Sequence, residues 1–447
     1  MAIDYNPFYP EAKEDPYPYY AAMRKESPVY RIPNTDVYAV TRYEDVSTML
    51  KHPEEFSSAG MRLMLMGSIV EGMGMGASST AGVAQIAAAA RRGAPLAAPE
   101  PPPVLPDMSA MSLDLTEFLT ARSVIMADPP VHGPLRALVN RGFTPRRIAA
   151  LEGRLRVISE QCLEHIRDDV RKSGEFDLVD RLTIPIPVRI IAELLGVEPD
   201  RYGEFKRWSD LIVAGVSGSA AGTRPPELLK AFNELYVYII SIAELRRKDP
   251  QEDLVSVIVQ AQEGDAELSN AEVVMFAILL LAAGNETTTN LLGNAVLALL
   301  RHPDQLAEVR SDPSLIPRLI EETLRWDSPV QALFRQATTD VELAGEKIPA
   351  GSIVLPVFAA ANRDDRQFPD GDRFDIHRDT QGHLAFGFGV HFCLGASLAR
   401  LEAKVALETL LSGLPDFELA PGQAEQVEYI DSFLLRGPKT LRLRATA

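Results

Sequence analysis

The sequence reads AFGFGVHFCLGASLAR from Ala385 to Arg400, and this stretch constrains the fold more than any other. It places Cys393, one of only two cysteines, among glycines and phenylalanines, directly before a segment typical of a helix. Glycine lets the backbone adopt unusual angles and lets a flat ligand approach closely. A cysteine ahead of a helix N-terminus is expected to favour the thiolate, because the helix dipole is positive at that end.

This thiol has several possible roles: a disulfide, a buried structural residue, a nucleophile or a metal ligand. The other cysteine, Cys162, lies in a helical pattern, and the N-terminus carries no export signal, so we expect a reducing cytoplasm where disulfides are rare. His391 is placed to act as the base of a nucleophile. Zinc would need three or four closely spaced ligands, and no CxxC is present. A single thiolate with glycines on both sides is also suited to act as the axial ligand of a haem iron.

The composition indicates a globular protein with a large core. The chain has 447 residues, of which 46% are hydrophobic and 24% charged, and its formal net charge is -17. That charge argues against a nucleic-acid partner, because it would not neutralise phosphates. The first 20 residues resemble neither a signal peptide nor a membrane anchor. We therefore expect small molecules or proteins as partners, and no membrane.

Most of the chain is typical of helix, with a few hairpins. Apolar and polar residues alternate over 29–41 around a turn signal, and strand patterns also occur over Val341–Pro356 and Phe433–Arg444. We find no repeat and no linker after about residue 120, and we interpret 1–447 as a single domain. An insertion at about 58–112 is rich in Met, Ala and Pro. It fits either a mobile segment or an adaptable apolar lid.

The most informative helix begins with a capping box, Ser269 and Glu272, and ends before Pro303. Its segment Val273–Ala283 is apolar on every side, which indicates a buried central helix, yet it is too short to span a membrane. Polar residues then follow over Ala283–Asn290. Buried polar groups are costly unless they are bonded, so we expect the Thr287 hydroxyl to bond the Ala283 carbonyl and Gly284 to permit a local opening for a ligand. A polar stripe facing solvent or another helix is the alternative.

Two further pairs of residues have helical spacing. Glu322 and Arg325 lie at i and i+3, and we expect an arginine of the following loop, Arg363 or Arg373, to reach back to Glu322. His132 and Arg136 lie at i and i+4, in a helix for which Asp128 is the expected N-cap and Pro129 the first residue. Such pairs are common on protein surfaces, where they contribute little.

Four motifs, which follow one another along the chain in the expected order, resemble one family. Phe386–Gly395 resembles the haem-binding signature of the cytochrome P450 monooxygenases, specifically the soluble bacterial type. Ala283–Thr288 resembles the oxygen-activating segment of their central helix, Glu322–Arg325 their buried charge pair, and Gly371–Phe374 the loop that completes that network. The resemblance implies the cytochrome P450 fold, mainly α with a minor β lobe.

The resemblance also implies roles for individual residues. Cys393 would be the axial ligand of heme b (iron protoporphyrin IX), Glu286 and Thr287 would deliver protons during oxygen activation, and Glu322, Arg325 and Arg373 would form the structural network. Propionates would be held by His132, Arg136, Arg335 and His391. The implied cofactor-binding set as a whole is His132, Arg136, Ala283, Gly284, Arg335, Phe386, Gly387, His391, Cys393 and Gly395.

The implied reaction is insertion of one oxygen atom from dioxygen into an apolar or amphipathic small molecule. The resemblance places substrate contacts at Leu211–Ser219, Ala282–Ala283, Val330–Phe334 and Ser432–Leu434. Electrons would come from a ferredoxin and ferredoxin reductase, with Arg136, Arg141, Arg146 and Arg147 as a basic docking face. A peroxide-driven oxygenase and a non-catalytic haem protein are the alternatives. We expect a cytoplasmic monomer.

Overall fold

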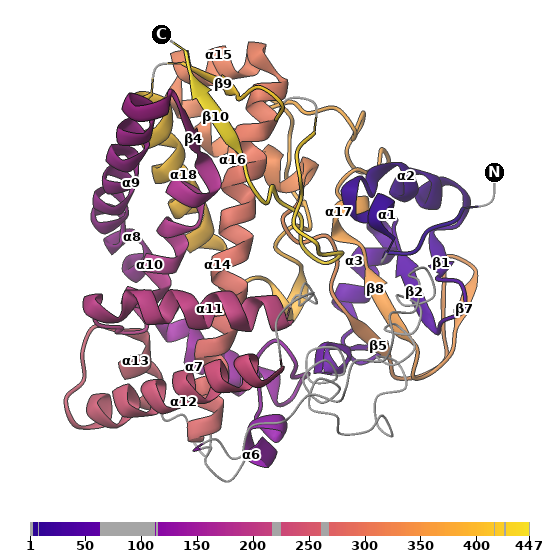
Figure 1. The fold of residues 1–447 in the computed structure, drawn as a ribbon. Helices are drawn as coiled ribbons and strands as arrows, with labels where there is room; N and C mark the ends of the chain where they lie inside the picture. The colour runs from indigo at the N-terminus through magenta and orange to yellow at the C-terminus, as the bar shows by residue number, and fades with distance from the viewer. Residues whose placement is uncertain are drawn as a thin grey trace, which may run out of the picture.

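The computed structural model describes residues 3–7, 9–62, 112, 115–216, 225–260, 268–414, 416–423 and 426–446. Most of the insertion at 58–112 lies outside these residues. The described chain is mainly helical with three small sheets, and the five-stranded sheet lies at one side of the helical bulk (Figure 1). The predicted fold class, mainly α with a minor β lobe, is confirmed.

The minor lobe is built on a five-stranded sheet with the order β1-β2-β8-β5-β3. β1 and β2 pair antiparallel, with Val29 opposite Val40, which confirms the hairpin predicted over 29–41. The strands are β1 (Val29–Arg31), β2 (Val37–Val40), β3 (Phe56–Ser57), β5 (Arg335–Ala337) and β8 (Ile353–Pro356). Four short helices accompany this lobe: α1 (Pro10–Glu14), α2 (Tyr17–Glu26), α3 (Tyr43–Lys51) and α17 (Phe358–Ala361).

The hairpin predicted over Val341–Pro356 is only partly correct. β6 (Val341–Leu343) and β7 (Glu346–Ile348) do form a hairpin. β8 instead pairs in parallel with β2 and antiparallel with β5. The chain turns between them, where Pro349 has no N–H to donate and Gly351 has a φ of 85°.

A three-stranded sheet with the order β4-β10-β9 lies within the helical part. Its strands are β4 (Glu175–Asp177), β9 (Phe417–Leu419) and β10 (Arg442–Ala445). The strand predicted from Phe433 therefore begins nine residues too early. Over 433–441 the chain makes only isolated bridges, Val330 with Leu435 and Tyr429 with Pro438. Pro438 cannot donate to a ladder, which explains the late start of β10.

The helical part contains most of the remaining elements, and their bounds are as follows: α6 (Leu115–Thr120), α7 (His132–Asn140), η2 (Arg141–Phe143), α8 (Pro145–Ala150), α9 (Glu152–Ser173), η3 (Val179–Thr183), α10 (Pro185–Leu194), η4 (Pro199–Arg201), α11 (Tyr202–Val216), α12 (Pro225–Lys248), α13 (Leu254–Gln260), α14 (Asn270–Arg301), α15 (Pro303–Ser311), η5 (Pro313–Leu315), α16 (Ile316–Trp326), η6 (Gly389–His391) and α18 (Ala396–Gly413).

α14 is the central helix, as predicted. The Ser269 hydroxyl accepts from the Glu272 N–H, and the Glu272 carboxylate accepts from the Ser269 N–H, so the capping box is confirmed. Helices α10, α11, α12, α16 and α18 all pack against it. In the part of the chain that the structure describes, α14 alone has the length and hydropathy to cross a membrane, but 67% of its most apolar window is buried inside the protein. Such burial is typical of a core helix.

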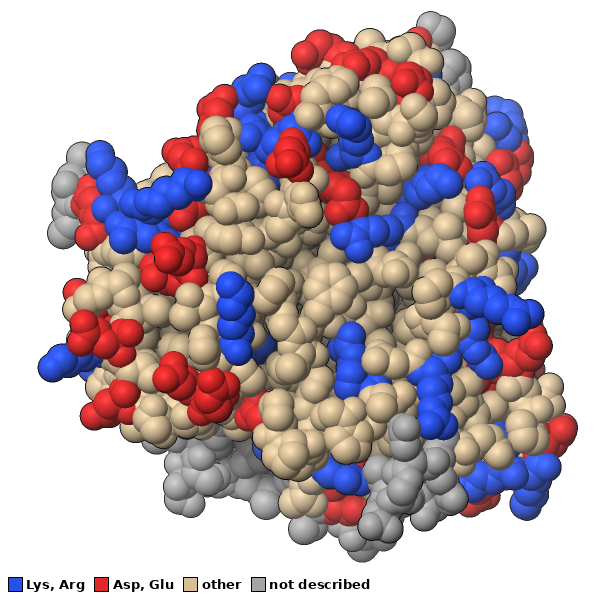
Figure 2. Space-filling view, turned by 180° about the vertical axis from the view of Figure 1, so that it is seen from behind, with Lys and Arg blue, Asp and Glu red and all other residues tan. Residues whose placement is uncertain are grey.

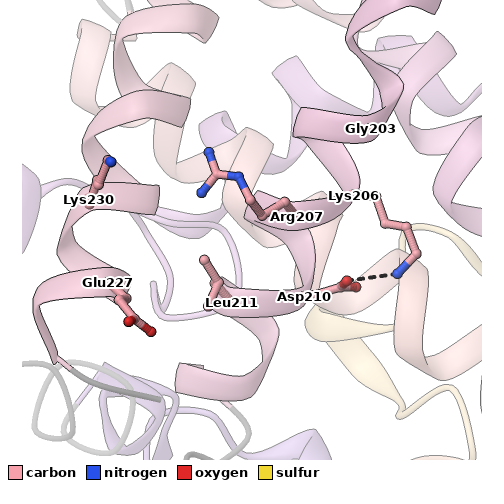
Figure 3. A pocket seen from close by; sticks show the side chains of 7 residues that line it. All are labelled: Gly203, Lys206, Arg207, Asp210, Leu211, Glu227 and Lys230. Carbon is pink, nitrogen blue, oxygen red and sulfur yellow. Dashed lines mark hydrogen bonds and ion pairs between the residues drawn. The ribbon is translucent and has the colours of Figure 1, made fainter.

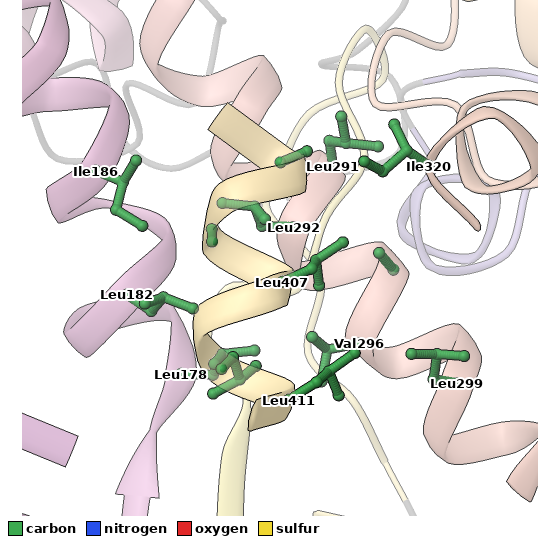
Figure 4. Packing of buried hydrophobic residues seen from close by; sticks show 14 of the residues in the cluster. Leu178, Leu182, Ile186, Leu291, Leu292, Val296, Leu299, Ile320, Leu407 and Leu411 are labelled. Carbon is green, nitrogen blue, oxygen red and sulfur yellow. The ribbon is translucent and has the colours of Figure 1, made fainter. Parts of the chain in front are cut away.

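The helix that follows Cys393 is fixed in the largest core cluster. Leu407 and Leu411 of α18 lie between Leu182 of η3 and Val296 of α14 (Figure 4). Burying such side chains contributes roughly 1.5–3 kcal/mol each. Cys162 on α9 belongs to the same cluster, and burial raises the pKa of its thiol to about 11, which fits a packed structural residue.

Charged side chains of both signs lie across the surface seen from behind in Figure 2. Basic and acidic residues are interspersed there around uncharged areas.

Candidate active site

The loop before α18 brings Cys393 to the N-terminal end of that helix. Two glycines shape it: Gly387 has a φ of 68° and Gly389 a φ of 71°. A Cβ on Gly389 would lie 2.6 Å from the Leu50 carbonyl oxygen, so this position also requires the absence of a side chain. The Cys393 N–H donates to the Phe386 carbonyl at 2.9 Å, which closes the loop.

The thiol of Cys393 is subject to opposing influences. Burial raises the pKa of this thiol, whereas the N–H groups of Gly395 and Ala396 and the guanidinium groups of Arg136 and Arg400 lower it. The helix end thus acts in the predicted direction, towards the thiolate, but in the polypeptide alone desolvation outweighs it and the net pKa is raised. A bound cation would add to the influences that favour the thiolate.

Four nitrogen-bearing side chains gather beside this loop. The rings of His132 and His391 lie 4.4 Å apart, and Arg335 on β5 is buried, with its Nη1 donating to the Phe334 carbonyl at 2.8 Å. Burial, followed by the positive charges of Arg335, His132 and Arg136, lowers the pKa of His391 to about 3. Burial also lowers the pKa of Arg335 to about 10. The cluster therefore favours an anion.

This arrangement fits a haem, whose two carboxylates need such donors. The Nε2 atom of His132 is buried and has no hydrogen-bond partner among the described groups, which leaves it available to a carboxylate. A Cβ on Gly395 would meet nothing within 4 Å, so there is open space at this residue, two positions after Cys393. The residues that would hold the group are thus Cys393 at the iron and His132, Arg335 and His391 at the carboxylates. Thiolate-ligated haem iron supplies oxygen activation when bound.

The helix that carries His132 begins later than predicted. α7 starts at His132 itself with Val131 as its N-cap residue, so the expected cap at Asp128 is wrong. The Asp128 carboxylate is used elsewhere: it accepts from the Ser57 hydroxyl at 2.5 Å and from the Ser58 N–H at 2.8 Å. The Asp128 carbonyl accepts from the His132 N–H at 2.9 Å, which fixes the start of α7.

Arg136 contacts the cysteine loop directly. Its Nη2 donates to the Phe392 carbonyl at 2.7 Å, and its Nε donates to Asn140 at 3.0 Å. Phe386 packs under Arg400, whose guanidinium carbon lies 4.5 Å from the ring centroid. Both arginines therefore hold the polypeptide around Cys393, in addition to any contact with a cofactor.

The polar segment of α14 contains the second group of predicted residues. The Thr287 hydroxyl donates to the Ala283 carbonyl at 2.6 Å, as predicted. α14 is continuous through Gly284, so the predicted local opening is absent from the described helix. A Cβ on Gly284 would lie 2.8 Å from Ile191 Cδ1, so α14 and α10 pack closely at this glycine. Ala283 is exposed although α14 is largely buried, as expected of a position that faces a ligand.

Glu286 is half-buried beside α11. Asn285 donates to the Ser209 hydroxyl at 3.0 Å, and both side chains are buried, so α11 is fixed against α14 at this point. Burial raises the pKa of Glu286 to about 7, and the negative charge of Asp210 adds to the effect. The Glu286 carboxyl is thus able to exchange a proton near neutral pH.

Asp210 also lies at the edge of a surface hollow of about 570 Å³ between α11 and α12. In Figure 3, Lys206 donates to Asp210 at 2.7 Å. Arg207 pairs with Glu234, and Leu211 lies between the two helices. The hollow is separate from Cys393. Its lining includes Asp210, the residue whose negative charge acts on Glu286.

Glu322 and Arg325 form the predicted buried pair. Arg325 donates from Nε and Nη2 to the Glu322 carboxylate, each at 2.7 Å, and neither side chain is exposed. Arg325 Nη1 also donates to the carbonyls of Asn362 and Gly371 at 2.9 and 2.7 Å. Every group of this pair is therefore satisfied, and the pair fixes the long loop that leads to Cys393.

The third member of the network is not the Arg373 side chain. Arg373 contributes its carbonyl, which accepts from Arg325 at 3.1 Å, while its guanidinium is exposed and pairs with Asp370 and Asp375. Arg378 approaches Glu322 instead, at 3.5 Å. Arg363, the other candidate, donates to the Trp326 carbonyl at 2.6 Å. The spacing could not distinguish these arginines, because a loop of this length can present any of them to Glu322.

The structure brings two of the predicted substrate segments together. The rings of Phe334 and Phe433 lie 5.9 Å apart, and the Gln331 N–H donates to the Leu434 carbonyl at 2.7 Å. Met61 joins them, with its sulfur 3.4 Å from the Phe334 N–H. Residues 217–219 of the predicted substrate segment Leu211–Ser219 lie outside the described residues.

Sequence reasoning missed several residues of the site. Ser58 lies 2.8 Å from His391 Nε2, yet it stands at the edge of the insertion, where no periodic pattern marks it. Asp210 and Arg378 also carried no motif, since their roles depend on contacts between distant elements.

Comparison with known proteins matches residues 226–445 to the family described as Cytochrome P450. A vitamin D(3) 25-hydroxylase of Pseudonocardia autotrophica is 38% identical over 95% of this chain and 92% of its own length. The solved structure of cytochrome P450 CYP109Q5 from Chondromyces apiculatus is similar at a TM-score of 0.80 and 41% identity, over 100% of this chain and 99% of that one. CYP109E1 from Bacillus megaterium in complex with testosterone gives 0.77 and 33%, over 97% and 100%.

A mainly helical fold with a cysteine before a helix and an anion-binding cluster beside it defines a haem-thiolate protein. The chain belongs to the cytochrome P450 family. It is a cytochrome P450 monooxygenase with heme b as its cofactor.

Proposed function

We propose that this monooxygenase hydroxylates or epoxidises an apolar or amphipathic small molecule of polycyclic or similarly bulky type. One observation carries the proposal: the acid and the alcohol of α14, Glu286 and Thr287, stand next to the exposed Ala283 in an otherwise buried helix. The pair supplies what oxygen insertion requires from the protein, a proton donor near neutral pH and a hydroxyl beside the reacting group.

Proton delivery is assigned to Glu286 and Thr287. Glu286 titrates near neutral pH, so it can take up a proton from solvent and release it. The Thr287 hydroxyl donates to the Ala283 carbonyl, which fixes its position. Its oxygen is thus presented as a hydrogen-bond acceptor on the exposed side of the helix. This pair disfavours the peroxide-driven alternative, because an enzyme that uses peroxide does not require proton delivery to dioxygen.

The substrate class is supported by apolar contacts and by similarity. Met61, Phe334 and Phe433 form an apolar group from segments far apart in the chain. Among the similar proteins, one is named for hydroxylation of vitamin D(3) and another was solved in complex with testosterone. Both ligands are apolar polycyclic or secosteroid molecules, so we infer a substrate of similar bulk and polarity.

Electron supply by a ferredoxin and ferredoxin reductase is the proposal that fits the surface around Cys393. Arg146 and Arg147 on α8 are exposed. Phe388, Val390 and Phe392 of the cysteine loop are also exposed, at 41–44%. Exposed apolar and basic side chains are suited to binding a transient, acidic redox protein.

We further propose that residues 1–447 act as one unit, as a cytoplasmic monomer. Segments near the two ends of the chain contact each other. Arg436 donates to the carbonyls of Lys13 and Glu14, and Lys13 pairs with Asp431 at 2.7 Å. The oligomeric state can be measured directly by light scattering of the holoenzyme.

The test is a binding screen followed by turnover. Steroids, vitamin D analogues, terpenes, fatty acids and macrolides are screened by the spin-state change of the haem. Every ligand that binds is then incubated with surrogate ferredoxin, reductase and NAD(P)H, or with hydrogen peroxide alone. Oxygenated product from the reductase system supports the proposal. Product from peroxide alone would favour the peroxide-driven oxygenase. NAD(P)H consumption without product from any ligand would favour the non-catalytic haem protein.

A further inference from the structure

Glu321 is an acid of α16 that the proposed function does not use, and it has two partners beside the cysteine loop. Arg400 of α18 donates to its carboxylate from Nε at 2.6 Å and from Nη2 at 2.8 Å, and His383 Nε2 lies 3.0 Å from the same carboxylate. Two bonds of this kind fix both the distance and the orientation of a guanidinium group. Burial raises the pKa of Glu321, but the bonds from Arg400 and His383 outweigh burial and lower this pKa to about 2, so the carboxylate is charged at neutral pH.

The backbone determines which ring nitrogen of His383 carries the proton. The Ala385 N–H lies 3.2 Å from His383 Nδ1, and an N–H can donate only to an unprotonated nitrogen. Nε2 therefore carries the proton and donates it to Glu321. His383 thus links the Glu321 carboxylate to the backbone of the segment that enters the cysteine loop.

Arg400 and His383 both lie beside Phe386. The guanidinium carbon of Arg400 is 4.5 Å from the centroid of the Phe386 ring, and the centroid of the His383 ring is 6.0 Å from it. A guanidinium group at this distance is attracted by the face of an aromatic ring. The Phe386 carbonyl accepts the Cys393 N–H at 2.9 Å. One acid of α16 therefore holds, through two partners, the residue that closes the cysteine loop.

Two adjacent glutamates of α16 fix opposite ends of the long loop that leads to the cysteine. The Glu322–Arg325 pair holds the beginning of the loop at the Asn362 carbonyl, and Glu321 holds its end at His383. The first pair is fully buried, whereas the side chains of Glu321 and its arginine are 28% and 38% exposed. An ion pair with this exposure contributes little to stability. The second pair is therefore better suited to adjusting the charge beside the cysteine than to holding the fold.

We propose that Glu321 is a positioning residue for the haem: it holds Arg400 against Phe386, neutralises its charge, and so sets the reduction potential at which the iron accepts an electron. This inference rests on the proposed role of Cys393 as the axial ligand. Burial raises the pKa of the Cys393 thiol, and Arg400 is among the cations that lower it, so the charge of Arg400 acts at the sulfur. Reduction adds one electron to the iron, and a positive charge beside the thiolate favours the reduced state.

The first test is the reduction potential of the purified holoenzyme, measured by spectroelectrochemistry with redox dyes. Glu321→Gln leaves the charge of Arg400 unpaired, so the equilibrium constant for reduction should rise by about threefold or more, which is about 28 mV for one electron. Arg400→Leu removes the cation and should lower the constant by a similar factor. Glu193→Gln is the matched control, because Glu193 also accepts bonds from Nε and Nη2 of an arginine, Arg154, and is similarly exposed. It should leave the potential unchanged.

The signs of the two shifts separate a charge effect from damage to the loop. Damage would move the potential of Glu321→Gln and Arg400→Leu in the same direction, and either this result or an unchanged potential in Glu321→Gln would overturn the proposal. The spectrum of the reduced carbon monoxide complex, recorded on the same samples, reports separately on the ligand role of Cys393. Unchanged potentials with a thiolate band overturn this inference alone, whereas a wild type without that band overturns the proposed ligand as well.

The second test uses the wild-type holoenzyme, so it does not depend on the folding of a charge variant. Nitrogen-15 spectra of the reduced carbon monoxide complex, labelled at its seven histidines, report which ring nitrogen of each carries the proton. We expect His383 to be protonated at Nε2 and unprotonated at Nδ1, and its signals are assigned by their loss in His383→Gln. A proton on Nδ1 would break the link from Glu321 to the Ala385 N–H and would overturn the proposal.

Discussion

Ser58 Oγ and His391 Nε2 lie 2.8 Å apart, although 333 positions separate them in the sequence. This contact joins the cysteine loop to the β3 region of the minor lobe, where Asp128 also binds Ser57 and Ser58. The anion-binding cluster is therefore assembled from both lobes: Arg335 comes from β5 and His132 from α7. Cofactor retention should depend on these contacts between lobes as well as on the cysteine.

Replacing Arg335 tests the proposed grip on the haem carboxylates. Arg335→Leu removes a buried cation that faces His391, and we expect the rate of haem loss to rise by about tenfold or more, as for a lost charge-assisted hydrogen bond. The rate is measured by transfer of haem to an excess of apomyoglobin. Arg31→Leu, an exposed position on β1 of the same sheet, is the control. Equal rates for both variants and wild type would remove Arg335 from the cofactor site.

The Glu322–Arg325 pair should be essential for stability. Arg325→Leu leaves the Glu322 carboxylate buried, so we expect a loss of about 3–5 kcal/mol in the free energy of unfolding. Urea unfolding of the holoenzyme, followed by circular dichroism, measures this loss.

Arg373→Ala is the matched comparison for that experiment. Its exposed guanidinium should contribute no more than about 0.5 kcal/mol, because only its carbonyl joins the network. A loss as large as that of Arg325→Leu would restore the Arg373 side chain to the role expected from the family pattern.

The coupling of NAD(P)H consumption to product formation should decline as the pH rises, because Glu286 titrates. Its raised pKa, about 7, means that the proton is held below neutral pH and lost above it, so the product formed per NAD(P)H should fall as the pH rises from 6 to 8. Asp210→Asn removes a negative charge that raises the pKa of Glu286, and the fall should then move to lower pH. Lys206→Met is the companion variant: it leaves Asp210 unpaired and should move the fall to higher pH.

The same titration has a defined effect on stability. Because the pKa of Glu286 is above its ordinary value of 4.5, the folded chain holds more protons than the unfolded chain between these two values. This carboxyl therefore contributes stability that is lost as the pH rises toward 7, and Glu286→Gln should flatten that part of the curve. A pH profile of coupling that is identical in wild type and Glu286→Gln would contradict the assignment of this residue.

The sequence predicted the features that depend on local chemistry. The capping box at Ser269, the Thr287 bond to Ala283 and the Glu322–Arg325 pair are set by spacing within one helix, and the structure contains all three. The hairpin over 29–41 could be predicted because strand alternation and a turn signal are also local features of the sequence.

The remaining features depend on contacts between distant segments. Asp128 does not cap α7, because Ser57 and Ser58 compete for its carboxylate, and no helical pattern contains them. Arg378 replaces Arg373 at Glu322 because the path of the loop, rather than its composition, selects the arginine. Gly284 lies close to Ile191, a contact that depends on the position of α10 and that no local pattern predicts.

Salt should slow electron transfer if an acidic ferredoxin docks beside the cysteine loop. Raising the ionic strength from about 0.01 to 0.15 M shortens the Debye length from about 30 to 8 Å, so attraction to Arg146 and Arg147 weakens. We expect a lower second-order rate of haem reduction in stopped-flow measurements, and a smaller salt effect in the doubly substituted R146A/R147A enzyme. A rate indifferent to salt would remove these arginines from the docking face.

The most direct test of the account is the absorption spectrum of the reduced carbon monoxide complex, recorded for wild type and for Cys393→His. If the sulfur of Cys393 is the axial ligand, wild type gives the long-wavelength Soret band of thiolate-ligated haem, and Cys393→His gives the band of imidazole-ligated haem. Wild-type protein that shows the imidazole type of spectrum in its active preparation, or a Cys393→His variant that keeps the thiolate band, would contradict the central claim.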